Sequence, residues 1–350
     1  MTKELEEYLL SIAGHSVNAK NPKLNKPEQI REFLQTIKTT HITAEKSGAE
    51  KYCTFYNGLA ILKSKGVVKK ADLTAADSYG MAELSKWLIK NGVNTPKLYS
   101  VFYADKHYVE VFDRAVGEQV YLSSADTVLK GAFGPDYDCD GFSNYTKEER
   151  KILCDYIYNF NKKSQLKMMS LPDETLDKYV KDIMFLVDAG FVNIDVNSGN
   201  VLLADNKFNI IDIDYRKTLE VFTMRLEVLL GRKCDVHDVV KKLDTNPRAF
   251  NLLLYNEQRT YTNDLAESVL FPFCSSRWFI NHLTEEQQQD LLMGDKVIVK
   301  RVVDALTRQG IEFNTNRGKC FNLLHETFNG DADTLLEVMG SQIQQQKSKL

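Results

Sequence analysis

The chain lacks any run of about 18 apolar residues, the length that a membrane-spanning helix requires. Residues 1–7 also lack the basic-then-apolar pattern that marks a signal peptide. We therefore expect a chain that is made in a cytoplasm and has no membrane span. Any export would use a route that does not involve a cleaved signal peptide.

The chain also lacks an excess of positive charge. Its 45 Lys and Arg stand against 48 Asp and Glu, a formal net charge of −3, so net charge does not indicate nucleic-acid binding. The six cysteines have no paired spacing, which predicts reduced thiols. What the chain has is 350 residues, 43% of them hydrophobic, enough for a two-lobed domain with an extension or for two domains.

The stretch 191–215 contains two short apolar runs, at 201–203 and 208–213. Asp205-Asn206-Lys207 joins them, and a short polar turn of this kind between apolar runs predicts a β-hairpin. This hairpin is flanked by polar residues whose side-chain oxygens could bind a metal ion.

Three oxygen-bearing side chains flank the hairpin. Asp195 and Asn200 lie on the loop that enters the first strand, and Asp212 lies at the exit of the second. Because a hairpin enters and exits at the same end, we expect these side chains to converge. Mg²⁺ keeps several waters and takes only one or two protein oxygens beside phosphates. The cluster therefore suits a magnesium nucleotide, with one carboxylate left to orient a nucleophilic hydroxyl.

The pattern Asp-x-x-x-x-Asn, an apolar strand, a turn and Ile-Ile-Asp resembles the catalytic loop and metal-binding strand of the protein-kinase-like fold. The resemblance implies that Asp195 accepts the hydroxyl proton and that Asn200 and Asp212 hold Mg²⁺. Asn193 and Ile194 stand where the eukaryotic pattern has His and Arg. The sequence is closer in pattern to small secreted effector kinases of enteric bacterial pathogens, of the OspG and NleH kind. This likeness implies a bacterial cytoplasm, with secretion into a host cell as a further route.

The segment before the hairpin has the order of a kinase small lobe. Asn57-Gly58 between apolar runs is a strong hairpin signal. Apolar alternation and helical periodicity predict strands at 52–56, 59–62, 67–71, 98–103 and 108–112 and a helix at 75–91.

The resemblance implies nucleotide-binding roles within this lobe. Lys69 would bind the α- and β-phosphates, paired with Glu83 on the helix. A one-residue slip of the strand would put Lys70 in its place. Of the glycines that usually cover the phosphates, Gly48 alone stands in place. In the connection 110–115, Glu110 and Phe112 would lie against ATP.

Helices dominate the rest of the sequence. A capping box at Thr146 opens a helix to about residue 162, and Asp173 is expected to cap a helix at 174–189. A helix at 219–230 follows the hairpin. Beyond it, no family resemblance is found for the helices predicted at 235–244, 247–258, 262–273, 284–293, 295–309, 317–328 and 331–345.

We therefore expect an α+β chain with a bilobal protein-kinase-like fold and an all-helical C-terminal extension. The predicted domains are an N-terminal helical segment at 1–46, a small lobe at 47–115, a large-lobe core at 116–232 and the extension at 233–350. Apolar periodicity in the first segment predicts two short amphipathic helices, which either pack onto the larger body or dock a partner.

Three functions are compatible with these residues. The first is transfer of phosphate from Mg-ATP to Ser or Thr of a protein substrate, which the resemblance places in a host cell. The second is a small-molecule phosphotransferase of the aminoglycoside or choline type, whose motifs share Asp195, Asn200 and Asp212. The third is a pseudokinase that acts as a binding module, which the degraded glycine loop favours.

Overall fold

The computed structural model describes a large part of the chain. The described residues are 46–47, 51–56, 58–64, 75–104, 107–121, 147–192, 194–251, 258–274 and 283–347. Gly48, Lys69 and Lys70 lie outside them, as do Thr146, the strand predicted at 67–71 and the helices predicted within 1–45.

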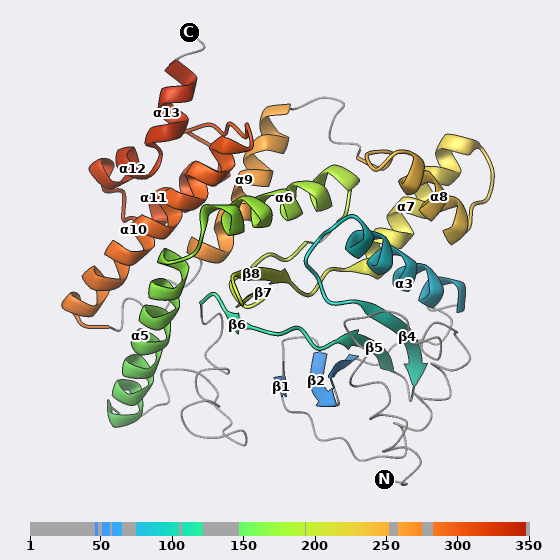
Figure 1. Cartoon of the computed structure of the whole chain (residues 1–350), viewed down its shortest axis with the longest axis horizontal. Helices are drawn as coiled ribbons and strands as arrows, with labels where there is room; N and C mark the ends of the chain where they lie inside the picture. Colours follow the sequence, from blue (N-terminus) through green and yellow to red (C-terminus); the bar gives the residue numbers. More distant parts are fainter. Residues whose placement is uncertain are drawn as a thin grey trace. The chain divides into compact units, whose positions relative to one another are not determined.

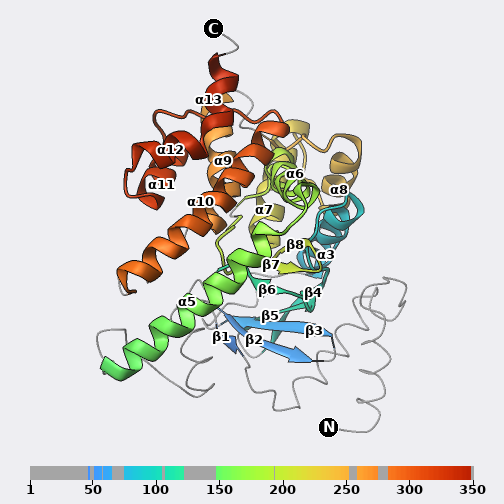
Figure 2. The ribbon, with the colours of Figure 1, turned by 60° about the vertical axis from the view of Figure 1, so that its left-hand side comes forward.

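The described chain is α+β, mostly helical, with two small antiparallel sheets (Figure 1). This confirms the α+β class. The larger sheet has five strands in the order β1-β2-β3-β5-β4, and the smaller has three in the order β6-β7-β8 (Figure 2). Among the helices of the described residues, none is long and apolar enough to cross a membrane.

The chain divides into two compact units, each made of two stretches of sequence. Unit 1 comprises Met1–Ala115 and Ile213–Phe250, and unit 2 comprises Val116–Asp212 and Asn251–Leu350. The predicted domain limits stay a prediction.

The five-stranded sheet belongs to unit 1. Leu59, Ala60 and Ile61 are buried in its central strand, and Gly58, with φ of 77°, lies in the turn that the Asn-Gly pair predicts. The predicted strands are confirmed where the structure describes them. The strands are β1 (Lys46–Ser47), β2 (Lys51–Tyr56), β3 (Leu59–Ser64), β4 (Leu98–Ala104) and β5 (His107–Asp113).

Three helices of unit 1 are described: α3 (Ala75–Lys90), α7 (Tyr215–Leu230) and α8 (Val236–Thr245). They can approach closely because α3 has Gly80 where it passes α8. A Cβ atom at this position would lie 2.5 Å from Cγ2 of Val236. The Asp214 carboxylate caps α7 by accepting from the Lys217 N–H at 2.9 Å, so the helix begins at Tyr215 rather than at the predicted residue 219.

The hairpin that the sequence predicts is present in unit 2 as β7 (Val201–Ala204) and β8 (Lys207–Ile210), with β6 (Glu118–Gln119) beside β7. Asp205 and Asn206 form its two-residue turn with φ of 46° and 57°, the sign that a type I′ turn requires at both positions. The second strand ends at Ile210, so the predicted run to residue 213 is wrong.

Seven helices of unit 2 are described: α5 (Lys147–Met169), α6 (Asp173–Ala189), α9 (Gln258–Cys274), α10 (Glu285–Arg308), α11 (Lys319–Thr327), α12 (Ala332–Val338) and α13 (Gly340–Lys347). Helix α5 extends past the predicted end near 162 because its buried face continues through Gln165 and Met168. Asp173 is the first residue of α6 rather than its cap, and its carboxylate pairs with Arg301 at 2.6 Å.

The helices predicted at 284–293 and 295–309 are one helix, α10. Thr284 and Gln287 form the predicted capping box at its start. Gly294 does not end the helix because it serves a close packing contact: a Cβ there would lie 2.2 Å from Oε1 of Gln165. The helix predicted at 247–258 is also wrong in its first part, since residues 247–250 form a turn.

Candidate functional site

The loop between Ile194 and β7 contains the first two predicted site residues. Asp195 is exposed, whereas Val196, Ser198 and Gly199 are buried and anchor the loop. From β6, the Gln119 side chain donates to the Gly199 carbonyl at 3.2 Å. The loop is therefore anchored directly after the exposed carboxylate.

Asn200 contacts Asp195 directly. Its Nδ2 donates to the Asp195 carbonyl oxygen at 2.9 Å and to Asp195 Oδ2 at 3.2 Å. Because both contacts use the amide nitrogen, the amide oxygen Oδ1 is the Asn200 side-chain atom left for a cation. This orientation fits the metal-binding role that the sequence predicts for Asn200.

Asn197 is a further member of this loop that the sequence prediction did not include. Its Nδ2 donates to Asp195 Oδ2 at 2.8 Å, and its Oδ1 accepts from the N–H groups of Gly199 at 2.8 Å and Asn200 at 3.1 Å. An available signal was the Asn two residues before a glycine, a pattern typical of Asx turns.

Asp212 lies two residues beyond β8, at the end of the hairpin where Asn200 enters it. Val201 pairs with Ile210 in the sheet, and the Ile211 N–H donates to the Asn200 carbonyl at 2.9 Å. Asp212 has φ of 60°, which ends the strand. The structure thus brings Asp195 and Asn200 into contact and puts Asp212 at the same end of the hairpin.

A magnesium site here would use two protein oxygens, from Asn200 and Asp212. Among the residues that the structure describes, no group of three or more His, Cys, Asp and Glu side chains is arranged to hold a metal. The set at the hairpin end is a smaller one, and its donors are the carboxylate and amide oxygens that Mg²⁺ takes alongside water and phosphate.

The other described site candidates, Glu83, Glu110 and Phe112, lie in unit 1. Glu83 on α3 pairs with Lys86 at 3.4 Å. Glu110 and Phe112 are in β5, which has β3 on one side and β4 on the other, so the connection after this strand begins at Arg114 rather than at residue 110. The nucleotide-binding roles of the three residues stay predictions.

A carboxylate with a shifted pKa ends β5. The Tyr99 hydroxyl donates to Asp113 Oδ1 at 2.8 Å, and Lys97 Nζ lies 4.5 Å from the centre of the Tyr99 ring. Burial raises the pKa of Asp113 to about 6, although the Tyr99 hydrogen bond and the Lys97 charge oppose the shift. Burial also lowers the pKa of Lys97.

Asp113→Asn is expected to stabilise the chain at pH 7 to 8 and to lose this advantage toward pH 4. The folded pKa of about 6 exceeds the unfolded value of 3.8, so the stability from the protonated Asp113 is lost as pH rises through 6. The gain should be about 1 to 2 kcal/mol at neutral pH after allowance for partial exposure. Urea unfolding at pH 4.5, 6.0 and 7.5 measures it, and an equal gain at all three values would contradict the assignment.

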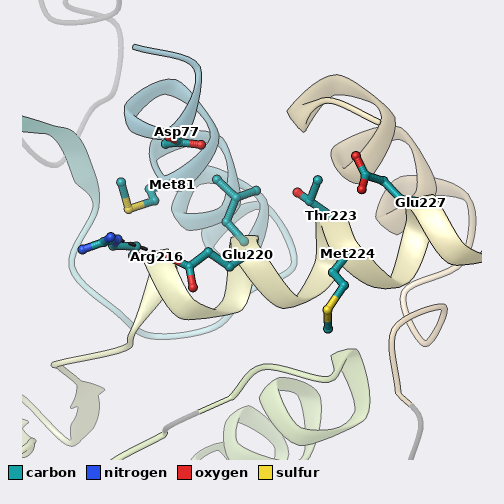
Figure 3. Close-up of a pocket in the computed structure, with 8 residues that line it drawn as sticks. Asp77, Met81, Arg216, Glu220, Thr223, Met224 and Glu227 are labelled. Atoms are coloured by element: carbon teal, nitrogen blue, oxygen red, sulfur yellow. Dashed lines mark ion pairs between the residues drawn. The ribbon is translucent and has the colours of Figure 1, made fainter. Parts of the chain in front are cut away.

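A groove of about 300 Å³ lies within unit 1 between α3 and α7 (Figure 3). Met81 of α3 and Leu219 of α7 give it an apolar part, and exposed Met224 lies at its edge. None of the predicted site residues lines it.

Two of the acidic groups of this groove have cationic neighbours. Glu220 pairs with Arg216 at 3.4 Å and with Lys217 at 3.4 Å, and Glu227 pairs with Lys233 at 3.2 Å. Arg216 also lies 4.6 Å from the centre of the Tyr108 ring. Part of the lining is thus an ion-paired surface.

No family model matches this chain, and no curated protein does. A solved structure to which it is similar is the crystal structure of a Helicobacter pylori proinflammatory kinase, CtkA, with 13% sequence identity over 89% of this chain and 97% of that chain. The TM-score of this match is 0.29.

Proposed function

We propose that this chain is a phosphotransferase that moves the terminal phosphate of Mg-ATP to a hydroxyl acceptor and has a bilobal protein-kinase-like fold. The observation that carries the proposal is the hydrogen-bonded Asp195 to Asn200 contact at the hairpin end that also holds Asp212. One exposed carboxylate, one amide oxygen and a second carboxylate are the groups that phosphoryl transfer requires of its catalytic loop and metal strand.

Asp195 is the group that would receive the proton of the acceptor hydroxyl. The donors that reach its carboxylate from Asn197 and Asn200 both go to Oδ2. Oδ1 is then the oxygen that faces an acceptor. An oriented carboxylate of this kind positions the hydroxyl for in-line attack, and positioning accounts for most of the catalysis in phosphoryl transfer.

Asn200 and Asp212 are the residues that would hold magnesium. Bound there, Mg²⁺ neutralises phosphate charge. In unit 1, Lys69 with Glu83 would bind the α- and β-phosphates, and Gly48, Glu110 and Phe112 would lie around the nucleotide.

The acceptor that we propose is Ser or Thr of a protein. This choice rests on the sequence likeness to secreted effector kinases of the OspG and NleH kind, as do the proposed bacterial origin, the host-cell substrate and a role in virulence. A small-molecule acceptor is the alternative that shares the same three residues.

Asp212→Asn is expected to lower phosphate transfer at least about tenfold, a loss of about 1.4 kcal/mol or more. The substitution removes the ligand charge, and Asn tolerates the positive φ of 60° at this position. Transfer is measured with radiolabelled ATP and Mg²⁺, in the presence of a eukaryotic cell lysate, an aminoglycoside or choline.

Asp205→Asn is the matched control, because Asp205 also has a positive φ, of 46°, and lies at the opposite end of the same hairpin. It should transfer phosphate like the wild type. Label on a lysate protein supports the protein acceptor, and label only on the aminoglycoside or choline supports the alternative. Thermal stabilisation by ATP without any transfer would refute the enzyme and favour a binding module.

A further inference from the structure

Asn197 is the residue through which the loop holds its exposed carboxylate. One side-chain amide makes three contacts: its nitrogen donates to Asp195 Oδ2 at 2.8 Å, and its oxygen accepts two backbone N–H groups, from Gly199 at 2.8 Å and Asn200 at 3.1 Å. The amide oxygen fixes the amide on the backbone, so the amide nitrogen is aimed at Asp195 with little freedom.

The backbone to which Asn197 is fixed is itself anchored. Ser198 and Gly199 are buried, and Gln119 donates to the Gly199 carbonyl at 3.2 Å. Asn200, the other residue that donates to Asp195 Oδ2, continues directly into β7. An exposed Asp side chain ordinarily samples several rotamers. Here two amide donors from an anchored loop converge on one carboxylate oxygen.

We propose that Asn197 is a positioning residue of phosphoryl transfer, which holds the Asp195 carboxylate so that Oδ1 faces the acceptor hydroxyl. This inference rests on the proposed function. It assigns to Asn197 a role through Asp195, distinct from the metal-binding role proposed for Asn200. A displacement of the reacting group by about 1 Å can cost on the order of a hundredfold in rate, so loss of this contact should be visible in turnover.

The competing explanation is that Asn197 only shapes the loop. Asn197→Asp separates the two roles, because a carboxylate still accepts the N–H groups of Gly199 and Asn200 but has no N–H to donate to Asp195. It also puts a negative charge beside Asp195, which drives the two carboxylates apart. Asn197→Ala removes the acceptor and the donor together. Ser198→Ala is the control in the same loop, because Ser198 Oγ is buried and has no hydrogen-bond partner among the described residues.

The experiment compares the full-length wild type, Asn197→Asp, Asn197→Ala and Ser198→Ala. ADP release from Mg-ATP, with water as the acceptor, gives kcat and KM, and thermal melting reports folding. Asn197→Asp should lower kcat about 10- to 100-fold with KM for ATP within about threefold of the wild type and an unchanged melting temperature. Asn197→Ala should lower both kcat and the melting temperature, and Ser198→Ala should change neither kcat nor KM.

Carboxyl footprinting with a carbodiimide and glycine ethyl ester gives a readout that needs no turnover. The rate of modification of Asp195, relative to Asp205 in the same chain, should rise at least about twofold in Asn197→Asp because one donor to Oδ2 is lost. If the wild type turns over ATP and Asn197→Asp has the same kcat, the positioning role of Asn197 is refuted and the proposed function stands. A wild type that neither binds nor turns over Mg-ATP refutes the proposed function, and the role of Asn197 with it.

Discussion

Asp195→Asn is expected to lower phosphate transfer from Mg-ATP by about 10² to 10⁴-fold, the range that a general acid or base contributes. The substitution changes one carboxylate oxygen to an amide nitrogen at nearly constant size. The Asn197 and Asn200 amides, which donate to Oδ2 at 2.8 Å and 3.2 Å, can donate to the remaining oxygen. The loop should therefore keep its conformation while the site loses its proton acceptor. Single-turnover transfer of radiolabelled phosphate measures the change.

The control again is Asp205→Asn, which makes the same chemical change in the exposed turn of this hairpin. Both variants should melt within about 2 °C of the wild type, since neither removes a buried group. Transfer by Asp195→Asn at more than about a tenth of the wild-type rate would fall outside the range for a catalytic base. That result would remove Asp195 from the chemistry and leave its hydrogen bonds with a structural role.

The hairpin and its turn could be predicted because their signals are local. Alternating apolar residues put Val201, Leu203, Phe208 and Ile210 on the buried face, and the Asp-Asn pair provides the two positive φ values of the turn. The capping box at Thr284 was predictable for the same reason, since both of its partners lie within four residues. Short-range chemistry of this kind needs no knowledge of the tertiary contacts.

The helix bounds predicted from the sequence were wrong where long-range contacts decide where a helix begins or ends. Glycine is a residue that often ends a helix. Helix α10 nevertheless continues through Gly294, because the Gln165 side chain of α5 occupies the space that a Cβ would fill. Asp is a residue type that often caps a helix N-terminus. The Asp173 carboxylate instead pairs with Arg301, which also donates to the carbonyls of Met168 and Met169 at the end of α5. A sequence pattern does not contain such partners.

The candidate site likewise contains residues that the sequence could predict and residues that it could not. The sequence predicted that Asp195 and Asn200 lie on the same loop, at the start of the hairpin, and the structure brings the two into hydrogen-bond contact. Asn197 was missed because the kinase-like motif singles out the first and last residues of the loop, whereas its hydrogen bonds connect Asp195 to the backbone within it. The raised pKa of Asp113 could not be predicted either, because its cause is burial, which the sequence near residue 113 does not show.

A buried polar cluster in unit 2 carries the largest expected effect on stability. The Tyr121 hydroxyl donates to Asp295 Oδ1 at 2.5 Å, and Gln165 Nε2 donates to the same oxygen at 2.7 Å and to the Leu291 carbonyl at 2.7 Å. Tyr121, Gln165 and Asp295 are all almost fully buried. Burial and the nearby Asp295 charge raise the pKa of Tyr121, so the hydroxyl stays protonated and donates.

Asp295→Ala is therefore expected to lower the free energy of unfolding by about 3 to 5 kcal/mol, the cost of removing one partner from a buried charged contact. The Tyr121 hydroxyl would lose its acceptor in a buried site, and the cavity adds to the loss. For a unit of this size the melting temperature should fall by roughly 10 °C. Urea and thermal unfolding followed by circular dichroism measure both quantities. Asp295→Asn should cost less, because its amide oxygen still accepts.

Asp304→Ala is the matched control, since Asp304 lies on the same helix and pairs with Lys300 at 3.1 Å near the surface. It should change stability by less than about 1 kcal/mol. The combination of Tyr121→Phe with Asp295→Ala should cost less than the sum of the two single changes, because both remove the same hydrogen bond. Equal losses from Asp295→Ala and Asp304→Ala, or additive losses in the double variant, would mean that the cluster does not hold α10 to the segment before α5.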